Sequence, residues 1–277
     1  MPLVEVSNAG FGYNGRAIFK NINLEVREGE VFCIVGPNGC GKTTFLDCLL
    51  GLLKLDQGDI LLGGRNIKTI RPPDVAKVLA YVPQSHQKTF PYTVMEIVLM
   101  GRASYTGIFS SPSPADISIA EEALAIVGLQ EYRNRPYTQL SGGEGQLVMI
   151  ARALAQKTPV IIMDEPTAHL DFKHELTVLE TMVQLVRNTG KSVIMATHFP
   201  NHAFYFENND VPTSVALMDK LTFSVIGRPG EVLSEKNLKS LYRINARVVS
   251  YQLDHNTEVK QIIPISTLYS KESERVN

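Results

Sequence analysis

The stretch that decides the fold is Gly36-Pro37-Asn38-Gly39-Cys40-Gly41-Lys42-Thr43. It matches the pattern G-x-x-x-x-G-K-[ST] at every fixed position, and this pattern is typical of a loop that holds the phosphates of ATP or GTP. Its glycines let the chain curl so that successive backbone N–H groups surround a phosphate. Lys42 offers a positive charge to the phosphates, and Thr43 offers a hydroxyl to Mg²⁺.

The neighbours of this loop supply the context that the pattern requires. The apolar, β-branched run Val31-Phe32-Cys33-Ile34-Val35 predicts a strand before it. Residues 44–50 contain no helix breaker and predict a helix after it, with its positive N-terminal end towards the phosphates. We therefore favour a phosphate loop over an ordinary glycine turn.

The composition is that of an ordinary globular chain. It has 277 residues, 44% of them hydrophobic, and 27 basic against 28 acidic residues give a net charge of -1. A nucleic-acid surface usually carries an excess of lysine and arginine, so we expect no nucleic-acid partner. Cys33, Cys40 and Cys48 form no C-x-x-C pair and predict reduced thiols in a cytosolic protein.

The sequence predicts no segment that enters a membrane by itself. Residues 1–6 do not resemble the start of a signal peptide, and no run reaches the roughly 18 apolar residues that span a bilayer. We expect any membrane role to come from a partner chain.

The first half of the chain contains a part with β-like patterning followed by a part with helical patterning. Residues 3–35 and 59–70 consist of short β-like runs separated by turns, and they predict a partly antiparallel β layer. Residues 86–157 predict a helical insert, because residues 117–127 and 146–156 have helical spacing and good helix formers.

The second half predicts an α/β sheet. Two continuous apolar runs, residues 160–163 and 193–196, are typical of parallel strands buried on both faces. Residues 172–186 between them predict the crossover helix. Such sheets bind ligands at the carboxyl ends of their strands. The tail beyond Gly230 has no periodicity that assigns a structure.

Polar side chains follow both apolar runs. Asp164 and Glu165 come after the first. In a P-loop enzyme an aspartate there helps to hold Mg²⁺, and the adjacent carboxylate can deprotonate the water that attacks the γ-phosphate. The alternative is a solvated strand end that turns at Pro166. A lone histidine at a strand end is more often structural, but His198 follows the third of three strands that carry motifs, so we expect it to donate to the γ-phosphate.

Leu140-Ser141-Gly142-Gly143-Glu144 has two interpretations. Ser141 with Glu144 three residues later is a capping box, which starts the helix that runs to about residue 156. A cap does not need two glycines, which cost roughly 1 kcal/mol each relative to alanine in a helix. Close approach of the backbone to a phosphate would need them.

Six motifs in one order resemble an ABC transporter ATPase subunit. They are residues 36–43 as Walker A, Gln84 after an apolar run, residues 140–144 as signature, residues 161–165 as Walker B, residues 168–171 as D-loop, and His198 as switch histidine. The resemblance covers most of the chain. It implies an α/β fold with a P-loop NTPase (RecA-like) core, an N-terminal antiparallel β layer and a helical ABC subdomain.

The resemblance also implies roles for individual residues. The segment from Gly36 to Thr44 would bind ATP, and two copies of the chain would pair head to tail, so that Ser141, Gly142, Gly143 and Glu144 act on the partner's nucleotide. Thr43, Gln84 and Asp164 would serve Mg²⁺, and Glu165, Gln84 and His198 would serve hydrolysis. Asp171 would approach the nucleotide from the D-loop.

Two of these roles have ordinary alternatives. Tyr13, in Phe11-Gly12-Tyr13, looks like the aromatic that stacks on adenine, but it could be a simple strand aromatic. Gln84 would link the γ-phosphate to the membrane subunit, but it could be a surface glutamine after Val82-Pro83.

The sequence departs from the family pattern in two places. Gly145 sits inside the expected signature helix, and Leu147 stands where a basic residue is common, which puts the stability of this helix and its contacts with the partner in doubt. Residues 206–214 look longer and more loop-like than usual.

Several stretches are similar to one importer subgroup, whose cargoes are iron–siderophore, haem, cobalamin, and molybdate or tungstate. They are Met100-Gly101-Arg102, Asp116, Leu129, residues 139–141, residues 151–156, residues 197–203, residues 230–233 through 241–242, and residues 262–264. This likeness implies a polytopic membrane permease dimer, an extracytoplasmic substrate-binding protein, and a place on the cytoplasmic face of the cell membrane.

We also predict domain limits and a docking surface. Residues 1–85 and 158–228 would form the nucleotide-binding core with its β layer, residues 86–157 the helical signature subdomain, and residues 229–277 a C-terminal extension. Residues 90–95 would either receive a permease coupling helix or belong to the helical core. The competing functions are a soluble ABC ATPase in repair or translation and a regulatory subunit that does not hydrolyse ATP.

Overall fold

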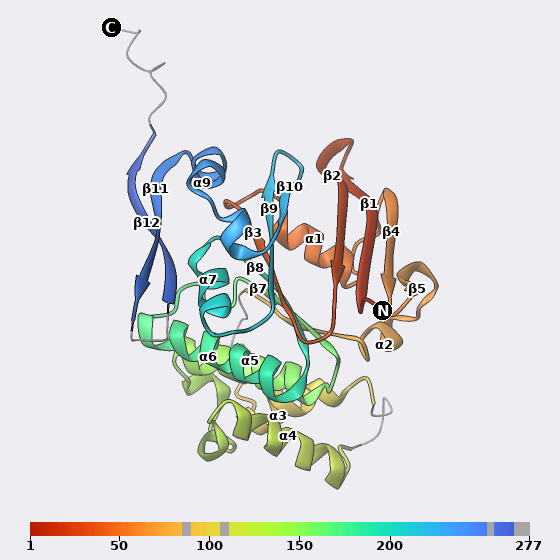
Figure 1. Ribbon diagram of the computed structural model, residues 1–277. Helices are drawn as coiled ribbons and strands as arrows, with labels where there is room; N and C mark the ends of the chain where they lie inside the picture. Colours follow the sequence, from red (N-terminus) through yellow and green to blue (C-terminus); the bar gives the residue numbers. More distant parts are fainter. Residues whose placement is uncertain (85–89, 106–110, 254–257, 269–277) are drawn as a thin grey trace, which may run out of the picture.

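The computed structural model describes residues 1–84, 90–105, 111–253 and 258–268. Its centre is a six-stranded sheet in the order β10-β9-β3-β8-β7-β6 (Figure 1). All neighbours in this sheet are parallel except β9 and β10, which are antiparallel. The strands are β3 (Val31–Val35), β6 (Leu79–Val82), β7 (Val160–Asp164), β8 (Ser192–Thr197), β9 (Thr213–Asp219) and β10 (Thr222–Gly227).

The apolar runs form the centre of this sheet, as the sequence predicted. Every residue of β3, β7 and β8 is buried. In β3, Val31, Cys33 and Val35 face one hydrophobic cluster, while Phe32 and Ile34 face the other. Because side chains alternate along a strand, such runs need cover on both faces.

The first face is covered by α1 (Lys42–Leu49) and by an antiparallel sheet in the order β2-β1-β4-β5. The Phe19 ring of the sheet packs edge-on against Phe45 of α1, with 5.4 Å between ring centroids. The layer was predicted to reach residue 35, but it stops at Val26, because a turn at residues 27–30 carries the chain into the core sheet. Its strands are β1 (Val4–Tyr13), β2 (Arg16–Val26), β4 (Gln57–Leu62) and β5 (Arg65–Asn66).

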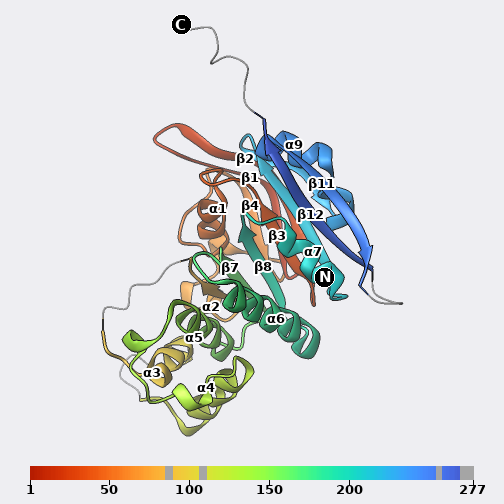
Figure 2. The same ribbon diagram turned by 90° about the vertical axis from the view of Figure 1, so that its left-hand side faces the viewer.

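The second face is covered by helices, as Figures 1 and 2 show. The predicted crossover helix is α6 (Phe172–Thr189), and the predicted insert contains α3 (Val94–Leu99), α4 (Pro114–Ile126) and α5 (Gly142–Ala155). Gly145 does not break α5, which runs without interruption and buries Leu147. The short elements are α2 (Pro72–Val75) and the 3-10 turns η1 (Ile67–Thr69), η2 (Met100–Arg102), η3 (Gln130–Tyr132) and η4 (Tyr137–Gln139).

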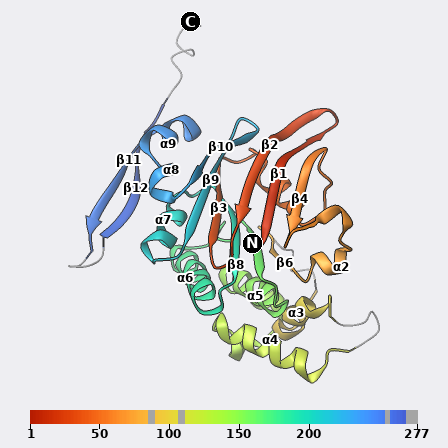
Figure 3. The same ribbon diagram turned by 45° about the vertical axis from the view of Figure 1, so that its right-hand side comes forward.

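The C-terminal region forms two short helices and a hairpin on the opposite side of the core sheet from the β layer (Figure 3). These elements are α8 (Pro229–Val232), α9 (Glu235–Tyr242), β11 (Ile244–Gln252) and β12 (Glu258–Thr267). The prediction of a long loop at residues 206–214 was wrong. Helix α7 (Asn201–Asn208) continues to Asn208 and β9 begins at Thr213, so only four residues connect them.

Within these described ranges, no helix has the length and apolar character to cross a membrane.

Candidate functional site

The phosphate loop connects β3 to α1 at the carboxyl edge of the core sheet. Gly41 has φ 105°, and a Cβ there would lie 2.8 Å from a methyl carbon of Ile18. Gly36 is equally restricted, since a Cβ would lie 2.8 Å from the Met218 carbonyl oxygen. A side chain would be strained by the positive φ at position 41 and would clash with the backbone at position 36, so both positions require glycine. The strand, glycine loop and helix therefore occur in the predicted arrangement.

Lys42 lies beneath this loop and is only 5% exposed. Its ammonium group donates to the carbonyl oxygens of Gly36 at 2.9 Å and Pro37 at 3.1 Å. It also lies 3.2 Å from Oε1 of Glu165. The lysine is thus held under the loop by two carbonyl groups and one carboxylate.

Through its side chain, Glu165 contacts several other polar side chains of the site. It follows β7 with φ 44°, a left-handed conformation that is costly for a residue with a side chain. Its Oε2 accepts from the Gln84 amide at 3.2 Å and lies 3.0 Å from Nδ1 of His198. The ends of β6, β7 and β8 therefore bring Gln84, Glu165 and His198 together, although these residues are far apart in the sequence.

Asp164 and Thr43 form the second polar pair. The Thr43 hydroxyl donates to Oδ2 of Asp164 at 2.7 Å. Oδ1 of the same carboxylate is buried and bonds to no group within the described ranges. Burial, followed by the neighbouring charge of Glu165, raises the pKa of Asp164. A buried carboxylate oxygen beside a hydroxyl is a suitable donor set for Mg²⁺, so these residues fit the ion.

Part of the loop and the residues around it line a cavity of about 330 Å³. The lining residues are Asn38, Gly39, Gly41, Lys42, Thr43, Thr44, Gln84 and Glu165. Cys40 is half-buried at the loop. Burial raises the pKa of its thiol, so Cys40 is not an activated nucleophile.

The signature residues do not line this cavity. Ser141 is the N-cap of α5 and forms a capping box with Glu144: its hydroxyl accepts from the Glu144 N–H at 3.2 Å, and Glu144 accepts from the Ser141 N–H at 2.7 Å. The capping interpretation of this segment is therefore confirmed.

The two signature glycines differ. A Cβ on Gly143 would lie 2.2 Å from the His174 ring, so packing inside the subunit explains this glycine. A Cβ on Gly142 would meet nothing within 4 Å, and Gly142 is exposed. No neighbour among the described residues of the subunit accounts for a glycine at position 142.

Tyr13 and Asp171 are also outside the lining of the cavity. Tyr13 ends β1, is 49% exposed and packs edge-on against Phe11. Asp171 is the N-cap of α6 and accepts from the His174 N–H at 2.9 Å. The structure gives Asp171 a local role that the sequence analysis did not foresee.

The C-terminal region supplies one contact that the sequence analysis missed. The Tyr242 hydroxyl donates to the carbonyl oxygen of His198 at 3.0 Å. The likeness to the importer subgroup includes Tyr242, but nothing in the sequence indicates this contact, and periodicity did not assign a structure to the tail.

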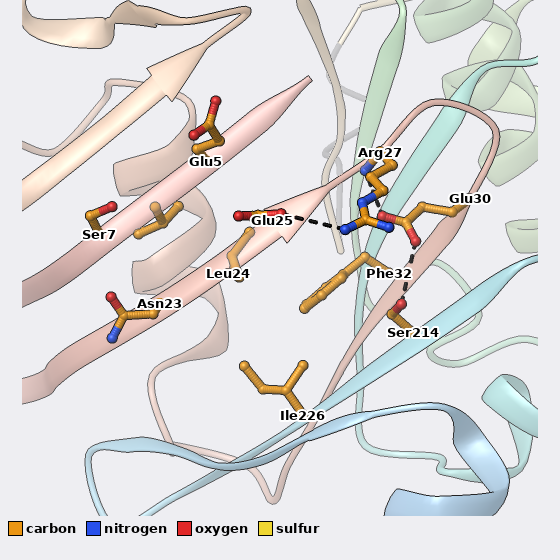
Figure 4. A pocket seen from close by; sticks show the side chains of 11 residues that line it. Glu5, Ser7, Asn23, Leu24, Glu25, Arg27, Glu30, Phe32, Ser214 and Ile226 are labelled. Atoms are coloured by element: carbon orange, nitrogen blue, oxygen red, sulfur yellow. Dashed lines mark hydrogen bonds and ion pairs between the residues drawn. The ribbon is translucent and has the colours of Figure 1, made fainter. Parts of the chain in front are cut away.

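A larger cavity, of about 530 Å³, lies between the β1–β2 edge and the amino-terminal ends of β3 and β9 (Figure 4). In its lining, the Arg27 guanidinium lies 3.7 Å from Glu25, and Glu30 accepts from the Arg27 backbone N–H at 2.6 Å and from the Ser214 hydroxyl at 3.3 Å. None of the predicted site residues lines it. We assign it no role.

Comparison with known proteins agrees with this geometry. The sequence model of the ABC transporter family matches residues 19–168, more than half of the chain. The chain belongs to the ABC transporter family. It has ATP as its nucleotide, and the predicted family, P-loop fold and ATPase class are confirmed.

Two curated relatives of this ABC protein are import ATP-binding proteins. The iron(3+)-hydroxamate import ATP-binding protein FhuC of Bacillus subtilis is 33% identical over 250 residues, covering 90% of this chain and 91% of that protein. The molybdate import ATP-binding protein MolC of Haemophilus influenzae is 33% identical over 242 residues, covering 87% of this chain and 88% of that protein.

Two solved structures extend the comparison. A chain of a metal-chelate type ABC transporter in an inward-facing conformation aligns with a TM-score of 0.83 and 30% identity, covering 96% of this chain and 98% of that one. A dimeric ATP-binding cassette in a post-hydrolysis state, bound to ADP and phosphate, aligns with a TM-score of 0.68 and 26% identity, covering 82% of this chain and 98% of that one.

Proposed function

We propose that this chain is the ATP-hydrolysing subunit of an ABC importer, which dimerises head to tail around two ATP molecules and drives a separate permease. The observation that carries the proposal is the convergence of Lys42, Gln84 and His198 on the carboxylate of Glu165, beside the phosphate loop. This arrangement places an ammonium, an amide and a carboxylate in the lining of one cavity, with an imidazole 3.0 Å from the carboxylate. Phosphoryl transfer to water needs such groups to position the nucleophile and to balance charge.

In this proposal, residues 36–44 bind the triphosphate. Backbone N–H groups of the loop and the positive end of α1 face the phosphates, and Lys42 pairs with their oxygens. Thr43 and Asp164 would hold Mg²⁺, with Gln84 nearby, and Mg²⁺ would neutralise charge on the β- and γ-phosphate oxygens. Tyr13 would stack on the adenine.

Glu165 is our proposed general base. It accepts a proton from the water that attacks the γ-phosphate, while Gln84 and His198 orient its carboxylate from two sides. The ion pair between Lys42 and Glu165 must loosen as the γ-phosphate competes for the ammonium group. That exchange would leave Glu165 free to act on water only when ATP is present.

The second copy of the chain would supply Ser141, Gly142, Gly143 and Glu144. Gly142 supports this part of the proposal because it is exposed at the N-terminal end of α5 and its own subunit does not require a glycine there. A phosphate of the partner's ATP could then approach the backbone and the positive end of α5 closely. Asp171 at the start of α6 would lie in the same interface.

The permease would be a polytopic membrane dimer, which holds the ATPase at the cytoplasmic face of the membrane. Phe90 and Tyr92 are exposed, with 6.0 Å between ring centroids, and they suit a docking surface. Val94 is fully buried and belongs to the helical core, so we propose only the exposed residues of the 90–95 segment for docking. An extracytoplasmic binding protein would deliver a metal chelate, a corrinoid or an oxyanion to the permease.

The alternatives find less support. The relatives described above carry importer names, and the net charge of -1 offers no basic excess for a repair or translation factor. A regulatory subunit without hydrolysis would not need Glu165 and His198 in contact.

Purification of the tagged chain from native membranes tests the proposal. We expect a polytopic membrane protein to copurify in fixed stoichiometry, with ATPase activity that the Glu165→Gln variant loses. A chain that remains free of membrane proteins and whose ATPase rises with nucleic acid would contradict the importer function.

A further inference from the structure

A hydrogen bond connects the C-terminal region to the site. Tyr242, the last residue of α9, donates its hydroxyl to the backbone carbonyl of His198 at 3.0 Å. His198 in turn lies 3.0 Å from Glu165 through Nδ1. One hydroxyl therefore connects the C-terminal region, through one backbone group, to the proposed general base.

The segment that follows His198 is fastened to the C-terminal hairpin at two further points. The side-chain amide of Asn201 donates to the Ile262 carbonyl at 3.0 Å and accepts from the Ile262 N–H at 2.8 Å. The Asn208 amide makes the same pair of bonds with Lys260, both at 3.0 Å. Helix α7 thus lies along β12 (Figure 2), and the amides at its two ends bond to β12 as a neighbouring strand would.

The switch segment also has supports of its own. The Thr197 hydroxyl accepts from the Phe199 N–H at 3.0 Å and lies 3.0 Å from Nδ1 of His202. These bonds fix residues 197, 199 and 202, but none of them engages the His198 carbonyl. Among the hydrogen bonds of the described residues, the Tyr242 hydroxyl is the partner of this carbonyl.

The environment of Tyr242 keeps its hydroxyl a donor. Burial raises the pKa of the phenol, and the nearby carboxylate of Glu165 raises it further. The phenol therefore stays protonated at neutral pH, and its hydrogen bond to His198 persists.

We infer that Tyr242 is a positioning residue for His198, so that the C-terminal region, through α9, influences the rate at which the site hydrolyses ATP. The inference rests on the proposed function, because it gives His198 a part in hydrolysis. Tyr242 touches neither ATP nor water in this account; it fixes the backbone from which the imidazole reaches Glu165. Loss of its hydroxyl should slow turnover without weakening ATP binding.

Tyr242→Phe in the full chain tests the inference. Loss of one hydrogen bond predicts that kcat falls by about 3- to 10-fold, with KM and the Kd for ATP changed by less than about 2-fold. Tyr251→Phe is the matched control, since it removes the hydroxyl of an exposed tyrosine in the same C-terminal region and should leave kcat unchanged. A Tyr242→Phe enzyme with the kcat of the wild type would overturn the inference.

A double-mutant cycle separates positioning from a general loss of structure. In a His198→Ala background, Tyr242→Phe should have no further effect on kcat, because its effect passes through His198. An equal fall of kcat in both backgrounds would contradict a role through His198. If His198→Ala itself leaves turnover unchanged, the proposed function of His198 fails, and the inference fails with it.

The imidazole resonances give a readout that does not depend on turnover. The chain has 6 histidines, and His198→Ala identifies the signal of His198 by its disappearance. Tyr242→Phe should shift this signal, whereas Tyr251→Phe should not. An unshifted His198 signal in Tyr242→Phe would overturn the inference even where the ATPase function holds.

Discussion

The ammonium group of Lys42 lies 3.2 Å from a carboxylate oxygen of Glu165, and both residues are buried, with exposed fractions of 5% and 9%. The residue that we assign to the phosphates and the residue that we assign to the attacking water are therefore ion-paired with each other. A buried pair is stable only while both partners remain. A γ-phosphate that enters the cavity competes with Glu165 for Lys42, which couples nucleotide binding to release of the base.

Lys42→Ala should weaken ATP binding. Charged hydrogen bonds of this kind contribute about 1.5 to 3 kcal/mol, so we expect the Kd for ATP to rise by about 10- to 100-fold. Titration calorimetry with ATP measures it, and Lys236→Ala, on the exposed face of α9, is the control. An unchanged titration curve for Lys42→Ala would count against the phosphate loop.

Glu165→Gln should nearly abolish turnover. The amide keeps the shape of the side chain but cannot take a proton, and removal of a general base typically costs about 10²- to 10⁴-fold in rate. ATP should bind at least as tightly as in the wild type, because Lys42 no longer has to break an ion pair with residue 165 before it contacts the phosphates. Steady-state ATPase assays and light scattering with ATP should show an inactive, ATP-dependent dimer. Normal turnover in this variant would remove Glu165 from the mechanism.

Alanine at the two signature glycines should have opposite effects on stability. Gly143→Ala forces a methyl group against the His174 ring and should lower the free energy of unfolding by about 1 to 3 kcal/mol. Gly142→Ala meets open space and should raise it by up to about 1 kcal/mol. Urea denaturation measures both. Equal effects at the two positions would show that His174 does not explain Gly143.

The buried ion pair between Arg102 and Asp116 should make stability depend on acid pH. Hydrogen bonds from the Ser113 hydroxyl and from Arg102 lower the pKa of Asp116 to about 2. An unfolded aspartate has a pKa of about 3.9, so the unfolded chain binds the proton first. The stability from Asp116 is complete above about pH 4 and is lost as the pH falls towards about 2.

Melting temperatures measured between about pH 4 and about pH 2 test this expectation, because the unfolded and folded pKa values of Asp116 lie near these limits. Asp116→Asn should melt at a lower temperature and show a shallower dependence on pH than the wild type. Asp210→Asn, at an exposed position, should keep the slope of the wild type. Parallel slopes for wild type and Asp116→Asn would contradict the role of this pair.

The parts of the structure that are determined by residues close together in the sequence could be predicted. The phosphate loop, the apolar strands and the capping box of Ser141 and Glu144 each carry a local pattern, and the structure contains all three. The carboxyl ends of parallel strands meet at one edge, so the meeting of Asp164, Glu165 and His198 could be predicted as well. The domain limits at residues 86–157 and 229–277 remain predictions.

Contacts between distant segments could not be predicted. Residues 207–210 are polar and suggest a loop, yet Asn208 is helical, and its amide pairs with the backbone of Lys260. The C-terminal hairpin buries few side chains, Ala246 and Ile262 among them, so its sequence shows little alternation. The bond from Tyr242 to His198 and the packing of His174 on Gly143 depend on tertiary structure alone.

In the proposed dimer, each ATP site combines the phosphate loop of one copy with the signature of another. Two variants test this arrangement, and each damages one half of the ATP site. Lys42→Ala damages the phosphate loop. Gly142→Glu damages the signature, because its negative charge is favourable at the N-terminal end of α5 but repels a phosphate. Each alone should be inactive as a homodimer. In a mixed dimer both lesions fall in one site, which leaves the other site intact.

The decisive measurement is therefore the ATPase activity of an equimolar mixture of the two inactive variants. Random pairing makes half of the dimers mixed, each with one intact site, so the account predicts recovery of about a quarter of the wild-type activity. If each subunit instead used its own signature, no combination would contain an intact site. A mixture that stays as inactive as its components would contradict the shared site.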